Sequence, residues 1–249
     1  MHSFWKRRAQ RNPFAVQPLL IVTKGWSYCT CYREAADEEM RVHQEWVYRQ
    51  VGKTFRILPT KILYSAMTAE EHAAPMRPDG RGSVYYDIKG QLDATAIYDA
   101  TGQRIEFCNW RRLYGLFATG NPLLGNMVGR QDPGWHCPPA PDNPMEPYGP
   151  GTAAMLVADG MEMAAGHGPI TYDASGLSDF NKWRGASLHE LLHCLALPHP
   201  PEEYKALYGD EVWYTPMGAW WNYPIDNRGT SAKLLLPEIE HLRANNFFA

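Results

Sequence analysis

The chain has 249 residues, of which 45% are hydrophobic and 12% aromatic, with a formal net charge of -3. A chain of this length and aromatic content can form a sizeable core, which excludes an intrinsically disordered protein. The near balance of charge also argues against a nucleic-acid-binding protein. The one basic cluster, Lys6-Arg7-Arg8 with Arg11, lies at the N-terminus, where we interpret it as a solvated tail.

No apolar run approaches the roughly 20 residues that a membrane-spanning helix needs, so no membrane span is expected. The most apolar stretch near the start, Pro18–Val22, is too short to be the core of a secretory signal. The chain as given therefore shows no signal peptide, and a secreted protein is expected only if a leader was removed. The cellular location stays open.

The cysteines number five, so at least one thiol has no disulfide partner within a monomer. Cys29 and Cys31 are separated by one residue, a spacing that we interpret as too tight for a comfortable mutual disulfide. A Cys108–Cys137 disulfide is possible if the protein is exported, although spacing alone does not establish it. The alternative is that the cysteines are small buried apolar residues.

The N-terminal part of the chain predicts a strand, a helix and a second strand. Val16–Thr23 is apolar and ends in β-branched residues, which is typical of a strand. Glu34–Val51 has apolar residues at helical spacing, and Gly52 follows it as a candidate C-cap. Thr54–Ser65 alternates as a strand does, although Pro59 removes one donor from any ladder.

The middle of the chain, Ala73–Gly151, is rich in glycine and proline and predicts little regular structure. The compact apolar run Thr152–Asp159 then predicts a buried strand, with a glycine-rich loop beyond it. Neither an internal repeat nor a linker divides the chain, so a single domain over residues 1–249 is expected.

Two histidines, His189 and His193, lie four residues apart, which on a helix places both imidazoles on one face. A third, His199, follows His189 by ten residues. Catalytic zinc takes three protein ligands of this kind and keeps a fourth position for water. Glu190 lies next to the first ligand, where its carboxylate can take a proton from that water. The pattern predicts a zinc-dependent hydrolytic site.

The stretch His189–His199 resembles the extended zinc motif of the metzincin metallopeptidases. This resemblance implies a zinc-dependent endopeptidase that acts on peptide or protein substrates, with Zn²⁺ held by the three histidines and Glu190 as general base. It also implies an α+β fold with two lobes: a mixed sheet with the active-site helix over about residues 1–196, and a smaller lobe with a closing helix over about 197–249. Substrate would lie between the lobes.

Other parts of the resemblance lie on both sides of the motif. Tyr214-Thr215-Pro216-Met217-Gly218 resembles the metzincin Met-turn, which implies that Met217 forms an apolar floor beneath the imidazoles. Ser231–Asn245 resembles the closing helix, and Pro237 favours a start near Leu236. The strand that borders the cleft would contain Met155, Leu156, Val157, Ala158 and Asp159, with extended substrate paired along its edge.

The sequence departs from the metzincin pattern at two positions. Ala196 replaces the glycine that usually allows the chain to turn after the second ligand. A left-handed backbone there would cost alanine on the order of 1 kcal/mol relative to glycine. Ala219 lies where some metzincins carry a tyrosine, so the sequence alone leaves an inactive peptidase as an alternative.

Two further alternatives concern the ligands and the class of protein. A gluzincin would use the same two histidines with a later glutamate as third ligand, and Glu202, Glu203 and Glu211 are candidates. A non-catalytic zinc-binding module would keep the histidines but has no need of Glu190. The presence of this glutamate favours an enzyme.

Overall fold

The computed structural model describes residues 12–65, 68, 97–98, 112–119, 128–130, 153–156, 164–167, 169–170, 172, 174, 176, 178–219 and 232–248. The strands are β1 (Ala15–Val22), β2 (Arg56–Ile57), β3 (Lys61–Ser65), β4 (Ile97–Tyr98), β5 (Arg112–Ala118), β6 (Val128–Arg130) and β7 (Ala153–Leu156). The helices are α2 (Thr30–Val51), α6 (Asp179–Cys194), α7 (Glu202–Tyr208) and α8 (Leu236–Ala244), with a 3₁₀ helix, η1, over Gly209–Tyr214.

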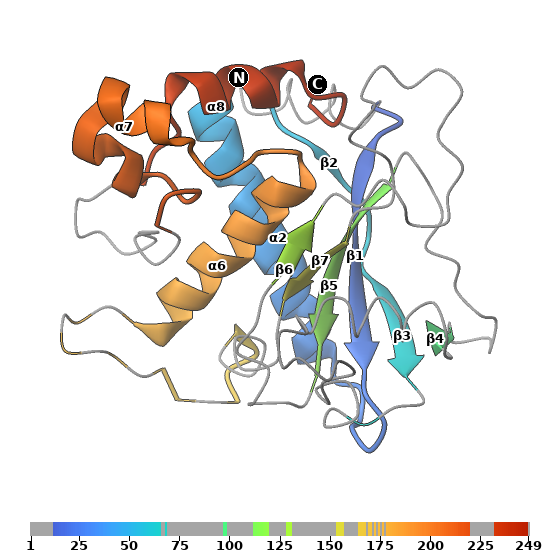
Figure 1. The fold of residues 1–249 in the computed structure, drawn as a ribbon. Helices are drawn as coiled ribbons and strands as arrows, with labels where there is room; N and C mark the ends of the chain where they lie inside the picture. Colours follow the sequence, from blue (N-terminus) through green and yellow to red (C-terminus); the bar gives the residue numbers. More distant parts are fainter. Residues whose placement is uncertain are drawn as a thin grey trace, which may run out of the picture.

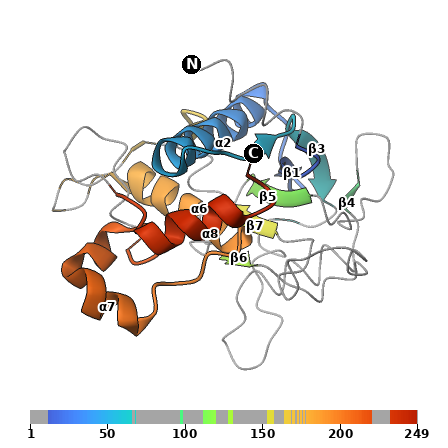
Figure 2. The same cartoon turned by 90° about the horizontal axis from the view of Figure 1, so that it is seen from above.

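The strands form one mixed sheet in the order β4-β3-β1-β5-β7-β6, and β2 also pairs with β1. The pairs β1–β3, β1–β5 and β5–β7 are parallel, whereas β4 and β6 run antiparallel to their neighbours. The described helices lie on one side of this sheet in both views (Figures 1 and 2). A mixed sheet with segregated helices is compatible with the predicted α+β class.

The core lies between the sheet and the two long helices. Every residue of β1 is buried, as expected for a central strand of a mostly parallel sheet. Helix α2 faces it with residues at helical spacing, including Ala36, Met40 and Val47, each at most 1% exposed. Helix α6 adds Leu188, Leu191 and Leu192 to the same cluster.

The predicted N-terminal elements are confirmed, with changed boundaries. Helix α2 ends at Val51, and Gly52 follows in the left-handed conformation with φ 75°, as predicted. The helix begins at Thr30 rather than at Glu34, because Cys29 serves as its N-cap. The second predicted strand is divided into β2 and β3, and Pro59 lies in the gap between them.

The strand expected to offer its edge to substrate has neighbours on both sides. Ala153–Met155 of β7 pairs with β6, and the whole of β7 pairs with β5. Met155 therefore does not lie at the edge of the sheet, and this part of the prediction is wrong. The reason is the short strand β6, whose three residues carry no recognisable pattern in the sequence. Val157, Ala158 and Asp159 lie outside the described residues.

The expectation for Cys29 and Cys31 is also wrong, because the two residues form a disulfide. Cys29 has an extended backbone as N-cap, and Cys31 belongs to the first turn of α2. This bend brings their Cα atoms to 5.2 Å, within the range usual for disulfides. Cys194 is a buried thiol, and Cys108 and Cys137 lie outside the described residues.

Helix α8 begins at Leu236 with Pro237 in its first turn, as predicted, and Ser231 lies outside the described residues. Hydrogen bonds connect the C-terminal end of α8 to the ends of α2 and α6. The Arg243 guanidinium donates to the Val51 carbonyl at 2.9 Å, and the Asn245 amide donates to the Leu195 carbonyl at 2.7 Å. In the described part of the chain, no helix has the length and apolar character needed to cross a bilayer.

Candidate metal centre

Helix α6 carries the first two histidines of the motif. Its N-cap is Ser178, whose hydroxyl accepts a hydrogen bond from the Asn181 amide at 3.1 Å, and Asp179 adds a negative charge in the first turn. Because His189 and His193 are four residues apart on this helix, both imidazoles point from one face.

A tight turn ends α6 and returns the chain toward these histidines. The Leu197 amide donates to the Leu192 carbonyl at 3.0 Å and the Ala196 amide to the His193 carbonyl at 2.9 Å, which is the Schellman pattern. Ala196 has φ 67° and is the one non-glycine residue with positive φ among the described residues. The left-handed conformation considered for this alanine is therefore present.

The turn brings His199 to the other two histidines. The three Nε2 atoms form a nearly equilateral triangle, with sides of 3.1 Å from His193 to each neighbour and 3.2 Å between His189 and His199. Nitrogens at tetrahedral corners around zinc, each 2.0–2.1 Å from the ion, are about 3.3 Å apart. The triangle therefore fits a tetrahedral zinc ion, and this group could hold a metal.

The other ring nitrogens show which tautomer is present. His189 Nδ1 lies 2.7 Å from the Pro216 carbonyl and His193 Nδ1 lies 2.8 Å from the Leu197 carbonyl. A carbonyl only accepts, so both Nδ1 atoms carry the proton and both Nε2 atoms present lone pairs. Lone pairs that face each other at 3.1 Å repel unless a cation lies between them. Histidines that bind a metal usually donate their other ring N–H to a carbonyl or carboxylate in this way, which fixes the orientation of the ring.

The local electrostatics keep these imidazoles neutral. Burial lowers the pKa of His189 to about 4, against a smaller opposing effect of the hydrogen bond to Pro216. Burial also lowers the pKa of His193. A neutral imidazole is the form that binds a metal, so neither residue must first lose a proton at neutral pH.

Glu190 lies beside the triangle. Its Oε1 atom is 4.0 Å from His189 Nε2, and the side chain is only 14% exposed. The carboxylate is thus close to the position of an ion without being one of the three converging ligands. It can reach a water molecule on such an ion.

The turn over Thr215–Gly218 fixes the carbonyl that anchors His189. The Thr215 hydroxyl accepts from the amides of Met217 and Gly218 at 2.9 and 3.2 Å, and donates to the buried Glu238 at 3.1 Å. Gly218 is required because a Cβ atom there would overlap the Val212 carbonyl oxygen. Met217 is 2% exposed and belongs to the core.

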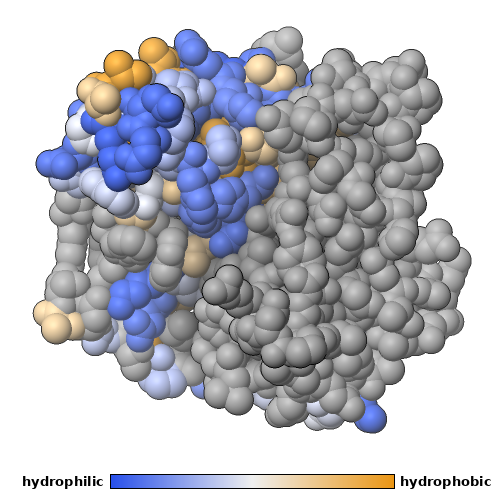
Figure 3. Space-filling view, viewed as in Figure 1, coloured by the Kyte–Doolittle hydropathy of each residue, from blue (hydrophilic) through white to orange (hydrophobic). Residues whose placement is uncertain are grey.

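The glutamates proposed for the gluzincin alternative lie elsewhere. Glu202 pairs with Lys205 at 3.2 Å, and Glu211 pairs with Lys233 at 3.0 Å. Glu203 is exposed on α7, a helix without a buried residue. Figure 3 shows hydrophobic residues among hydrophilic ones over this part of the surface. The structure brings His199, and none of these three glutamates, into the described ligand group.

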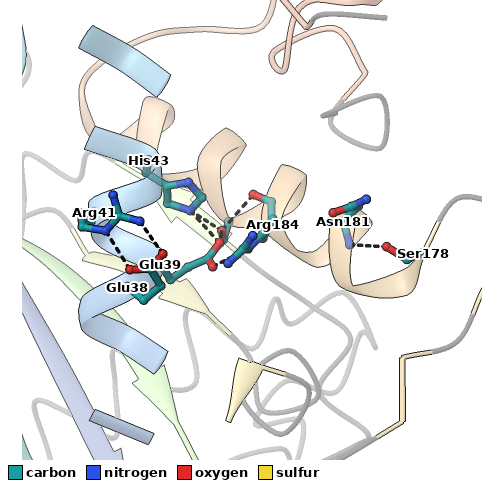
Figure 4. Close-up of polar contacts among 8 residues, drawn as sticks. Glu38, Glu39, Arg41, His43, Ser178, Asn181 and Arg184 are labelled. Carbon is teal, nitrogen blue, oxygen red and sulfur yellow. Dashed lines mark hydrogen bonds and ion pairs between the residues drawn. The ribbon is translucent and has the colours of Figure 1, made fainter. Parts of the chain in front are cut away.

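A buried polar network joins α6 to α2, and sequence analysis missed it. Glu39 on α2 is 2.8 Å from the Arg184 guanidinium on α6, and His43 Nε2 is 2.5 Å from the Ser187 hydroxyl (Figure 4). Burial raises the pKa of Glu39 to about 7, although Arg184 opposes this, and burial lowers the pKa of His43 to about 3. The sequence offers a signal for this network, because the polar residues Glu39 and His43 both fall in the apolar stripe of α2.

Comparison with known proteins identifies the fold only. No family model matches the chain, and no curated protein matches it. Among solved structures, the fold is similar to a catalytically inactive form of OgpA from Akkermansia muciniphila, solved in complex with an O-glycopeptide substrate, glycodrosocin. The TM-score is 0.51 at 14% identity, and the match covers 96% of this chain but only 62% of that one.

Proposed function

We propose that this protein is a zinc-dependent peptidase of the metzincin type. His189, His193 and His199 hold Zn²⁺, and Glu190 is the general base. The observation that carries the proposal is the triangle of Nε2 atoms, with sides of 3.1–3.2 Å, whose lone pairs on His189 and His193 are fixed by hydrogen bonds at Nδ1. Zinc is the ion that best suits three neutral imidazoles at tetrahedral spacing.

Each residue of the proposed site has a separate role in peptide hydrolysis. When bound, zinc would polarise the scissile carbonyl and lower the pKa of a water molecule. Glu190 takes the proton from the attacking water and then delivers it to the leaving amine. The carbonyls of Pro216 and Leu197 keep the two helical imidazoles oriented, which maintains the ligand geometry.

The position of the site relative to the sheet supports a peptide substrate. β6 is one of the two outer strands of the described sheet, and it is the one that lies beside α6, which carries His189 and His193 (Figure 1). An extended peptide can add to such a strand through main-chain hydrogen bonds. We therefore assign the substrate-binding edge to β6 rather than to Met155–Asp159. The similarity to OgpA, which binds an O-glycopeptide, supports a hydrolase directed at peptides.

The proposal keeps the two-lobe organisation. Residues of about 1–196 form the upper lobe, and those of about 197–249 form the lower lobe closed by α8. Met217 lies in the turn that anchors His189, and it forms the apolar floor of the site. Replacement of Met217 by leucine, which has a similar volume, should leave zinc bound.

The decisive experiment separates zinc binding from proton transfer. Wild type, Glu190→Gln and His199→Ala are assayed for zinc content and for cleavage of a peptide library, with and without O-linked sugars. Glu190→Gln should retain zinc but lose activity by about 10²–10⁴-fold, because only the proton transfer is removed. His199→Ala should lose both.

A matched control is Glu203→Gln, an exposed glutamate on α7 that should retain both zinc and activity. If Glu190→Gln cleaves at the wild-type rate, Glu190 is not the base, and the zinc has a structural role. If Glu203→Gln or Glu202→Gln loses zinc while His199→Ala keeps it, the third ligand is a glutamate, as in a gluzincin. Cleavage only of glycosylated peptides would define the substrate class.

A further inference from the structure

A second group of metal-binding side chains lies at the start of α2. Cys29, Cys31 and His167 each offer a ligand atom, and these atoms lie within 4.8 Å of one another. His167 is 136 residues from Cys31 in sequence, and its Nε2 atom lies 3.4 Å from the Cys31 sulfur. Thus a distant segment of the chain places an imidazole against the two sulfurs.

This group is separate from the three-histidine site. Glu39 and His43 of α2 contact Arg184 and Ser187 of α6, so the two helices run in the same direction. The Cys31 end of α2 therefore lies toward the start of α6, whereas His193 lies in its last turn. The helical rise over the twelve residues from Cys31 to His43 is itself about 18 Å.

His167 is exposed, but its contacts orient it. The Tyr32 hydroxyl lies 3.4 Å from His167 Nδ1, and the two rings pack edge to face with centroids 5.3 Å apart. Tyr32 is only 3% exposed and is itself part of the core. A buried tyrosine thus holds Nδ1 and leaves Nε2 directed at the sulfur, an arrangement used to orient metal-binding histidines.

Both cysteines lie at the N-terminus of α2. The Cys31 amide donates to the Cys29 sulfur at 3.1 Å. The first turn of α2 contains no acidic residue, and it contains Arg33. The backbone at the start of α2 thus directs an amide at the Cys29 sulfur, and the helix dipole is positive at this end.

We propose that Cys29, Cys31 and His167 form a redox-controlled zinc site. In the oxidised protein the two cysteines form the disulfide seen here; in the reduced protein their thiolates and the His167 imidazole bind one zinc ion. Two sulfurs and one imidazole are a normal zinc ligand set that leaves one position for an external ligand. Cys29 and Cys31 are half-buried and His167 is exposed, so the group lies near the surface.

The redox step balances with a small thiol of the glutathione class as reductant. Two equivalents of that thiol are oxidised to their disulfide, while the Cys29–Cys31 bond breaks and each sulfur gains one electron and one proton. Zinc binding then releases both protons, because thiolates are the ligands. The site therefore binds zinc only under reducing conditions.

The test is zinc stoichiometry on the full chain in two redox states. Wild type is prepared oxidised, or reduced with a phosphine and freed of reductant under anaerobic conditions, and each form is saturated with zinc and desalted. The reduced form should retain one equivalent more than the oxidised form. Cobalt substitution should add thiolate-to-metal charge-transfer absorption only in the reduced form.

Variants identify the residues that bind the extra equivalent of zinc. It should disappear in Cys29→Ser/Cys31→Ser, which keeps a good N-cap, and in His167→Ala, but persist in Cys194→Ser. His189→Ala/His193→Ala should lose the equivalent of zinc that binds in both redox states, and should retain the equivalent that binds only in the reduced form. This proposal and the peptidase proposal can therefore fail independently. Equal zinc in both redox forms, or an extra equivalent that survives in Cys29→Ser/Cys31→Ser or in His167→Ala, would overturn the proposal.

Discussion

The carboxylate of Glu39 lies 2.8 Å from the Arg184 guanidinium, and this ion pair joins α2 to α6, the helix that carries His189 and His193. Glu39 is 1% exposed and the Arg184 side chain 13% exposed, so water screens the pair weakly. The Ser187 hydroxyl lies 3.5 Å from the same carboxylate, two residues before His189. The position of α6 thus depends on a buried charge pair.

Arg184→Met should destabilise the protein on the order of 3 kcal/mol at pH 8, because it leaves a buried carboxylate without its counter-charge. Without Arg184, Glu39 has a still higher pKa and takes up a proton, so the loss should shrink as the pH falls toward 5. Urea unfolding at both pH values measures this. Glu39→Gln/Arg184→Met should recover much of the loss.

Arg41→Met is the matched control for that experiment. Arg41 pairs with Glu38 on the exposed side of the same helix, and its side chain is 55% exposed. An exposed pair contributes at most about 1 kcal/mol, so this variant should unfold near the wild-type midpoint. Equal effects of the Arg41 and Arg184 changes would contradict the buried role of Glu39.

The buried His43 side chain should make the stability of the protein depend on pH. Burial lowers its pKa to about 3 from an ordinary value near 6.5, so the unfolded chain binds the proton more readily than the folded chain. Stability should therefore fall as pH decreases from about 6.5, and between pH 7 and pH 5 His43 alone should account for about 2 kcal/mol. His43→Gln should reduce this slope without abolishing it, because burial also lowers the pKa of His189, which remains. An identical slope in both proteins, measured without metal, would contradict the prediction.

Ala196→Gly should leave the free energy of unfolding unchanged or raise it by up to about 1 kcal/mol. Glycine relieves the cost of φ 67° but adds conformational entropy to the unfolded chain. Ala186→Gly, within α6, provides the opposite expectation: a loss of about 1 kcal/mol from lower helix propensity. Thermal unfolding of both variants checks the pair, and destabilisation by Ala196→Gly would show that the alanine methyl group has a packing role.

Gly218→Ala should weaken zinc binding by about 10–100-fold without touching a ligand. The added Cβ overlaps the Val212 carbonyl oxygen, so the turn must move and take the Pro216 carbonyl away from His189. Competition with a chromophoric chelator measures the affinity. Gly115→Ala is the control, because its added Cβ meets Met40 at an ordinary 3.5 Å. Wild-type affinity in Gly218→Ala would mean that the turn does not support the ligand.

Local features were predictable from the sequence, and long-range ones were not. The end of α2 at Gly52 and the start of α8 near Pro237 follow from the properties of single residues. The convergence of the histidines follows from spacing within eleven residues. Strand β6 escaped prediction because pairing with β7, rather than its own three residues, defines it. The role of Glu39 depends on Arg184, 145 residues away.

The three histidines lie close together in the sequence, and this has a consequence for folding. His189, His193 and His199 are joined by one helix end and one turn, so little chain entropy is lost in bringing them together. The β1–β5 pairing, in contrast, joins Ala15 to Arg112 and must close a loop of nearly a hundred residues. Contacts of such separation form slowly. Zinc added during refolding should therefore bind α6 and its turn before the sheet is complete, and the refolding rate should depend on metal concentration only in the early phase.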